Sequence, residues 1–191
     1  MNITSFLLYC FIVTVTPGPT NIDILSTVNN HGTKRAMQYT YGATIAFGLL
    51  LAISAMLNTM LITVIPKILI VMQIIGSIYM LYLAYQIYKM DTSKPIVNKT
   101  GTFKSGFLMQ FLNPKVVTFT MTVFPSFILP YYTAMHAVTI SVITITLIGF
   151  VSFIIWVLFG TIFKSFLQKH EKIVNVIMAL FLVYAAIMIW L

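Results

Sequence analysis

Thr16-Pro17-Gly18-Pro19-Thr20-Asn21 interrupts the first long apolar stretch of the chain, which extends from Thr4 to Val28. The two prolines remove two backbone donors, and the glycine between them adds conformational freedom. Inside a bilayer, the backbone groups released by such a break need partners in the protein or in a water-filled cavity. Asp23 follows at a depth where a charge costs about 2.5–3.5 kcal/mol. A broken span that also carries a charge predicts a functional site here.

The composition is that of a polytopic helical membrane protein. The 191 residues are 60% hydrophobic and 7% charged, with a mean hydropathy of +1.00. A soluble domain has about 25% charged residues, so that class is excluded. We expect an all-α fold with one transmembrane domain over residues 1–191. The net charge of +8 is explained by basic loops beside the membrane, so no nucleic-acid partner is expected.

Six membrane spans are predicted from the apolar stretches. They are Thr4–Val28, Met37–Thr63, Ile68–Tyr88, Ser105–Leu129, Ala134–Phe163 and Ile173–Leu191. Only Val64–Lys67 separates the second span from the third, and only Pro130–Thr133 separates the fourth from the fifth. Both pairs are therefore expected to form tight antiparallel hairpins.

The basic residues predict the orientation of these spans. Most of them lie in the loops after the first, third and fifth spans: Lys34, Arg35, Lys89, Lys94, Lys99, Lys104, Lys164, Lys169 and Lys172. Lys67 alone lies on the opposite side, and Lys115 lies within the fourth span. Because cytoplasmic loops carry the excess of Lys and Arg, these loops are expected in the cytoplasm and both termini outside it.

The chain is expected to consist of two halves, about residues 1–89 and 105–191, joined by a polar linker at about 90–104. Three spans in each half would make related halves inverted in the membrane. Leu81–Tyr85 resembles Leu180–Tyr184, and Leu112–Lys115 interrupts the fourth span much as the double proline interrupts the first. Paired interruptions in two inverted halves point to a transporter whose substrate site lies near the bilayer midplane.

The two breaks predict a site for a zwitterion. Half-helix ends present free amides and carbonyls, hence a positive and a negative pole in a medium of low dielectric constant. Asp23 is expected to receive an ammonium group or a coupling proton, and Lys115 to attract a carboxylate. The predicted substrate site consists of Pro17, Gly18, Pro19, Thr20, Asn21, Asp23, Asn113, Pro114 and Lys115.

Two other interpretations of these residues remain open. Asp23 and Lys115 could form a structural ion pair between the halves, or Lys115 could extend toward the cytoplasmic surface. The sequence offers no grouping of His, Cys, Asp or Glu with metal-ligand spacing, and no Ser–His–Asp arrangement or phosphate loop. We therefore expect neither an enzyme nor a bound metal or cofactor.

The whole chain resembles the LysE/RhtB family of bacterial amino-acid exporters. The matching stretches are Thr16–Pro19, Gly32–Ala36, Gly76–Tyr85 and Gly106–Lys115. The resemblance implies an inner-membrane exporter of amino acids or related metabolites, driven by the proton gradient. It also implies that the Pro-Gly-Pro and Asn-Pro-Lys elements belong to the transport core, whereas the role of Asp23 rests on the physical argument above.

The expected function is secondary export by alternating access, and the apolar spans favour a neutral amino acid over a basic one. Substrate, protons and the lipid bilayer are the expected partners. An exporter of inorganic ions or metals and an accessory membrane protein without transport are the alternatives. The sequence leaves the oligomeric state open, a homodimer being one option.

Overall fold

The computed structural model describes residues 3–89 and 101–188; within these ranges it describes the backbone alone at residues 57–73, 76, 86, 171, 185 and 188. Every element over these ranges is a helix, as expected for an all-α protein. The elements are α1 (Ile3–Val15), α2 (Pro19–His31), α3 (Thr33–Tyr88), α4 (Phe103–Leu112), α5 (Pro114–Val123), the π-helix η1 (Phe124–Ile128), α6 (Met135–Ile162), α7 (Lys164–Lys169) and α8 (Glu171–Met188).

Both predicted breaks are present. α1 ends at Val15 and α2 begins at Pro19, with an angle of 51° between the two helices. α4 ends at Leu112 and α5 begins at Pro114. Each second helix has a proline in its first turn, where the missing N–H leaves no intrahelical bond unmade. The sequence thus dictates these two interruptions locally.

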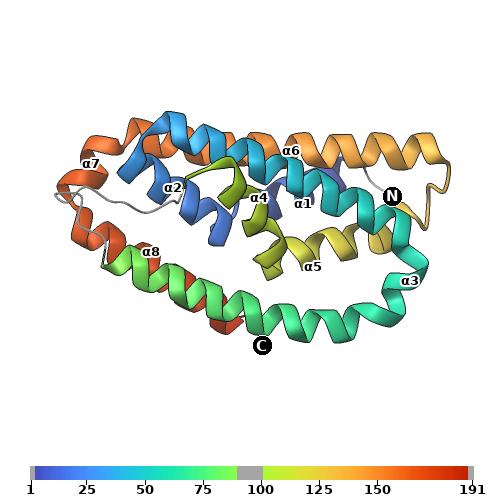
Figure 1. Cartoon of the computed structure of the whole chain (residues 1–191). Helices are drawn as coiled ribbons and strands as arrows, with labels where there is room; N and C mark the ends of the chain where they lie inside the picture. Colours follow the sequence, from blue (N-terminus) through green and yellow to red (C-terminus); the bar gives the residue numbers. More distant parts are fainter. Residues whose placement is uncertain (1–2, 90–100, 189–191) are drawn as a thin grey trace.

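The boundary predicted between the second and third spans is wrong in one respect. α3 is a single helix of 56 residues that continues through Val64–Lys67. An isolated proline in an apolar helix bends the helix more often than it ends it, because neighbouring groups satisfy the freed carbonyl. The two ends of α3 nevertheless lie on opposite sides of α2, α4 and α5 (Figure 1).

Most of the predicted linker, about 90–104, falls outside the residues that the structure describes. Residues 90–100 lie outside the described part of the chain, and α4 already begins at Phe103. A capping box starts this helix: Ser105 N–H donates to Thr102 Oγ1 at 3.1 Å, and Thr102 N–H donates to Ser105 Oγ at 2.9 Å. The helix of the predicted fourth span therefore begins at Phe103, two residues before the expected start at Ser105.

Two described helical segments are long and apolar enough to cross a membrane, Thr33–Met56 and Met135–Ile162. The bent pair α1–α2 makes a third span if the two helices are counted together. The short connection predicted before the fifth span is present, since η1 ends at Ile128 and α6 begins at Met135. Six spans and an inverted arrangement of two halves remain predictions.

The interior of the bundle is polar along α2. Every residue of this helix from Pro19 to Asn29 is buried, including Thr20, Asn21 and Asp23. The first part of α3, together with α6, lies on one side of α2, and α8 with the last part of α3 lies on the other (Figure 1). A helix that is buried all round yet polar is costly unless its side chains bond one another or a ligand.

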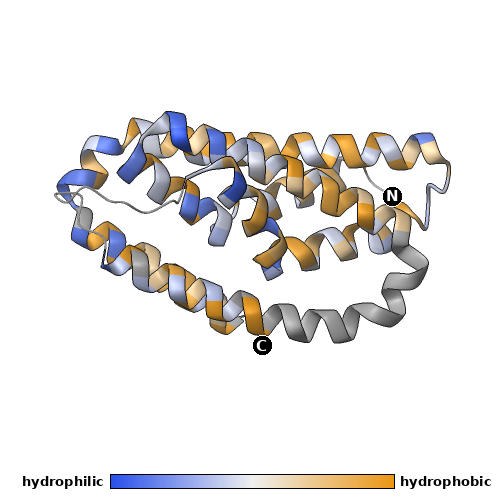
Figure 2. Cartoon of the chain, viewed as in Figure 1, coloured by the Kyte–Doolittle hydropathy of each residue, from blue (hydrophilic) through white to orange (hydrophobic). Residues whose placement is uncertain are grey.

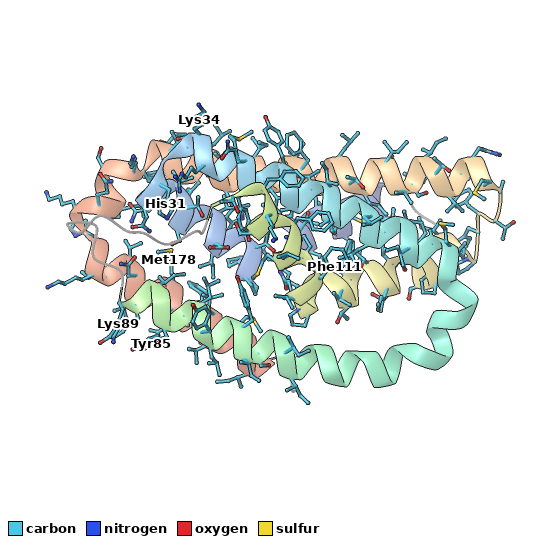
Figure 3. The ribbon with its side chains drawn as sticks, viewed as in Figure 1. His31, Lys34, Tyr85, Lys89, Phe111 and Met178 are labelled. Atoms are coloured by element: carbon cyan, nitrogen blue, oxygen red, sulfur yellow. The ribbon has the colours of Figure 1, made fainter. Side chains whose placement is uncertain are left out.

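Hydrophilic residues otherwise gather at the end of the bundle that holds α7, whereas α6 is hydrophobic along most of its length (Figure 2). Lys34 and Lys89 lie toward this same end (Figure 3), and α7 contributes Lys164 and Lys169. This grouping agrees with one basic side of the protein. That this side faces the cytoplasm follows only from the charge rule.

α3 and α4 cross at very short range through two glycines. A Cβ atom on Gly106 would collide with the backbone carbonyl of Tyr39, and one on Gly42 would collide with the carbonyl of Phe103. Small residues commonly allow membrane helices to approach in this way. The crossing holds α4, and with it the second break, against the first half of the chain.

We expect Gly106→Ala to lower the stability of the detergent-solubilised protein by about 1–3 kcal/mol or more, because the backbones must separate to admit one methyl group. Thermal unfolding measures this effect. Gly48→Ala is the matched control, since a Cβ there would lie 3.1 Å from the side chain of Thr146, which can move. Equal melting temperatures for the Gly106 variant and the unmodified protein would show that the close crossing is not required.

Candidate substrate site between the two helix breaks

The two breaks meet in space, and Lys115 joins them. Its Nζ donates to the backbone oxygen of Thr16 at 3.0 Å and to Thr16 Oγ1 at 2.9 Å. The stem of the lysine passes over Gly18, where an added Cβ would lie 3.2 Å from Lys115 Cδ. Gly18 therefore leaves the space that lets a cation from α5 reach the C-terminal end of α1.

Carbonyls released at the end of α1 are bound by side chains from three other helices. Asn21 Nδ2 of α2 donates to Thr14 O at 2.9 Å and to Thr16 O at 2.8 Å. Trp156 Nε1 of α6 donates to Val15 O at 2.9 Å. With Lys115 of α5, these donors satisfy the acceptors that a broken helix exposes at membrane depth.

Thr20 is the second residue of α2 and connects this break to the second one. Its Oγ1 accepts hydrogen bonds from Gln110 Nε2 at 3.0 Å and from Asn113 Nδ2 at 2.9 Å. Asn113 is itself fixed, because its Oδ1 accepts from the backbone N–H of Lys115 at 3.1 Å and so caps α5. A buried hydroxyl thus receives two amide donors from the other half of the chain.

A cavity of about 30 Å³ lies at this junction. Its lining consists of Val13, Thr14, Gly18, Thr20, Asn21, Phe47, Asn113, Lys115, Val116, Phe119 and Phe153. The polar groups come from the two breaks, and three phenylalanines form most of the apolar wall. Since roughly 10–15 Å³ suffices for one water, the cavity has room for about two waters in this conformation. An amino acid would require the helices around it to separate.

Five of the nine predicted site residues line this cavity: Gly18, Thr20, Asn21, Asn113 and Lys115. Pro17, Pro19 and Pro114 are not among its lining residues, and they contribute by breaking the helices. Asp23 is also absent from the lining. The structure therefore brings together the two breaks and the lysine but not the carboxylate.

Asp23 instead faces two tyrosines of α3. Asp23 is 3% exposed and interacts electrostatically with the buried Tyr39 and the partly buried Tyr79. The carboxyl is close enough to bond Tyr39, although the Tyr39 hydroxyl makes no hydrogen bond of good geometry. Lys115 and Asp23 thus have different partners, Thr16 and the tyrosines, rather than each other.

Sequence reasoning missed Trp156, Gln110 and Tyr39. Gln110 and Tyr39 had a detectable signal, because a buried amide or phenol in an apolar span needs a polar partner. Trp156 had the same signal through its indole N–H. None of these signals identifies the partner. Within the residues that the structure describes, no three His, Cys, Asp or Glu side chains are grouped so that they could hold a metal ion.

Replacing Trp156 by Phe leaves Val15 O without its donor, and we expect a loss of about 1–3 kcal/mol in stability. Thermal unfolding in detergent checks this. Tyr41→Phe is the matched control, because it removes a hydroxyl from an aromatic side chain that is 50% exposed. If both variants melt together with the unmodified protein, the indole bond is not needed to satisfy the break.

Comparison with known proteins agrees with this architecture. The LysE type translocator family matches residues 11–191. A cysteine/O-acetylserine efflux protein of Klebsiella pneumoniae is 33% identical over 190 residues, covering 98% of this chain and 96% of the relative. The protein of the same name from Escherichia coli K12 is 27% identical over 189 residues, covering 98% and 97%. No solved structure matches. The chain belongs to the LysE type translocator family, and it is a membrane transporter rather than an enzyme.

Proposed function

We propose that this protein exports small neutral amino acids across the cytoplasmic membrane, and that the substrate binds in the cavity between the two helix breaks. The observation that carries the proposal is Lys115, a half-buried cation whose ammonium group is held at the junction of both breaks by Thr16. The names of the relatives support the substrate class, since cysteine and O-acetylserine are both small and neutral overall. Lys115 is positioned to bind the carboxylate of such a molecule.

The charge of the cavity favours a neutral amino acid over a basic one. Lys115 is the one charged residue in its lining, and the nearby carboxyl of Asp23 faces away toward Tyr39 and Tyr79. A lysine or arginine substrate would bring a second cation into a medium of low dielectric constant without a compensating anion. The phenylalanine wall can contact an apolar substrate side chain, but it provides no partner for a charged substrate side chain.

The packing supports two halves that move against each other, about residues 1–89 and 105–191. Each predicted span contacts its counterpart in the other half. Gly48 approaches Thr146 while Gly149 approaches Phe47, and Tyr9 of α1 packs on Phe119 of α5 with ring centroids 6.1 Å apart. Reciprocal contacts of this kind are expected of inverted repeats that rock about a central site in alternating access.

Asp23 is proposed as the coupling-proton site, separate from the substrate cavity. Protonation changes the charge of the Asp23 carboxyl by one unit. In a buried environment this change is large enough to shift an equilibrium between two conformations of the protein. Asp23 lies in α2, whose first turn holds Thr20 and Asn21 of the cavity. Protonation from the outside would therefore act on the helix that forms one wall of the substrate site.

The test of the exporter is loss of preloaded amino acids from proteoliposomes, scanned with a mixed pool. We expect selective release of one or a few small neutral amino acids, and at least a tenfold lower rate for Lys115→Met because the carboxylate loses its partner. Lys104→Met, which removes an exposed lysine from α4, is the control. Release of no amino acid by folded, inserted protein would overturn the proposal.

An imposed proton gradient tests Asp23. We expect the gradient to accelerate export by the unmodified protein and to have no effect on Asp23→Asn, which keeps the size of the side chain but cannot exchange a proton. Exchange of labelled for unlabelled substrate without a gradient is the control, because it needs the cavity but no net proton movement. An Asp23→Asn protein that responds fully to the gradient would remove Asp23 from the coupling mechanism.

A further inference from the structure

The Asn21 side chain has one amide atom bound and one unbound. Its Nδ2 donates to both Thr14 O and Thr16 O, while its Oδ1 is buried without a hydrogen-bond partner. The residue is 3% exposed and lines the cavity beside Lys115. A buried amide oxygen without a partner costs about 1–3 kcal/mol, so its presence at a ligand cavity needs a reason.

The orientation of this amide is fixed by its surroundings. Turning it over would place Oδ1 against two backbone carbonyl oxygens, where no hydrogen is available to share. Oδ1 must therefore remain the free atom, and it is an acceptor with no donor. No group in the protein donates a hydrogen bond to Asn21 Oδ1, so a molecule bound in the cavity would need to supply the donor.

Lys115 shows where a cationic donor is held. Its ammonium group binds Thr16 O and Thr16 Oγ1, the same carbonyl that Asn21 Nδ2 contacts. Carbonyls at the C-terminal end of a helix form the negative pole of its dipole, which favours a cation. The end of α1 is therefore an ammonium-binding position that the protein occupies with its own lysine.

We propose that Asn21 Oδ1 and Thr16 O form the subsite for the α-ammonium group of the substrate, in exchange for Lys115. On binding, the substrate ammonium takes the place of Lys115 Nζ at Thr16 O and fills the acceptor at Asn21 Oδ1. The released Lys115 pairs with the substrate carboxylate. No charge is created in this exchange, because the zwitterion supplies one cation for the carbonyl and one anion for the lysine.

This inference rests on the proposed export function and narrows the range of substrates that the protein should accept. Both the α-ammonium and the α-carboxylate are required, and the ammonium is recognised by neutral acceptors rather than by Asp23. The substrate side chain is left to Phe47, Phe119 and Phe153. The transporter should therefore discriminate by the α-carbon groups more sharply than by the side chain.

The test compares cysteine with two of its analogues as inhibitors of labelled serine efflux from proteoliposomes. 3-Mercaptolactate has a hydroxyl in place of the ammonium, and cysteamine lacks the carboxylate. For the unmodified protein we expect both analogues to inhibit at least tenfold more weakly than cysteine. For Asn21→Ser, which loses the amide oxygen, we expect the difference between cysteine and 3-mercaptolactate to shrink at least fivefold.

Gln110→Met is the matched control, because Gln110 is another buried amide, bonded to Thr20, that does not line the cavity. The ratio of the inhibition constants for cysteine and 3-mercaptolactate should stay unchanged in this variant. If Asn21→Ser fails to fold, the comparison of cysteine with its two analogues on the unmodified protein still tests the ammonium subsite. Equal inhibition by cysteine and 3-mercaptolactate would overturn the ammonium subsite while leaving amino-acid export intact. Absence of protein-dependent serine or cysteine movement would instead overturn the proposed function.

Discussion

The unsatisfied end of α1 is the constraint on which the rest of the structure depends. A helix that stops at Val15 within an apolar span leaves carbonyls that lipid cannot bond. Asn21, Trp156 and Lys115 satisfy them from α2, α6 and α5. One local break therefore fixes the relative positions of three other helices, and the second break is brought to the first through the lysine that follows it.

The same constraint explains why the site is polar but nearly closed. Donors at the junction are used within the protein, and the remaining cavity has room for about two waters. The hydrogen bonds from Lys115 to Thr16 stabilise this closed arrangement. In the exchange that we propose, the ammonium of a zwitterion would replace Lys115 at Thr16, and its carboxylate would replace Thr16 at Lys115. A transporter needs this property, because a ligand changes a conformational equilibrium only through contacts that differ between the two states.

Local chemistry made part of the fold predictable. Proline and glycine act on their own neighbours, so the breaks at Pro17–Pro19 and Pro114 and the all-helical class followed from the sequence. Contacts between residues far apart in the sequence could not be predicted in this way. The hydrogen bond from Trp156 to the carbonyl of Val15 is an example. The placement of Asp23 beside Tyr39 depends on how α2 turns after a 51° bend, which no pattern of residue types specifies. The continuity of α3 likewise depended on whether Pro66 would end the helix.

The central claim is that substrate binds where the two breaks meet. Val116→Cys in a Cys10→Ala background places one thiol on the cavity wall, because Cys10 is the single native cysteine and is buried elsewhere. The rate of its modification by a small thiol reagent should fall several-fold when serine or O-acetylserine saturates transport. Modification that proceeds equally fast with and without such a saturating substrate would contradict a binding site at this junction.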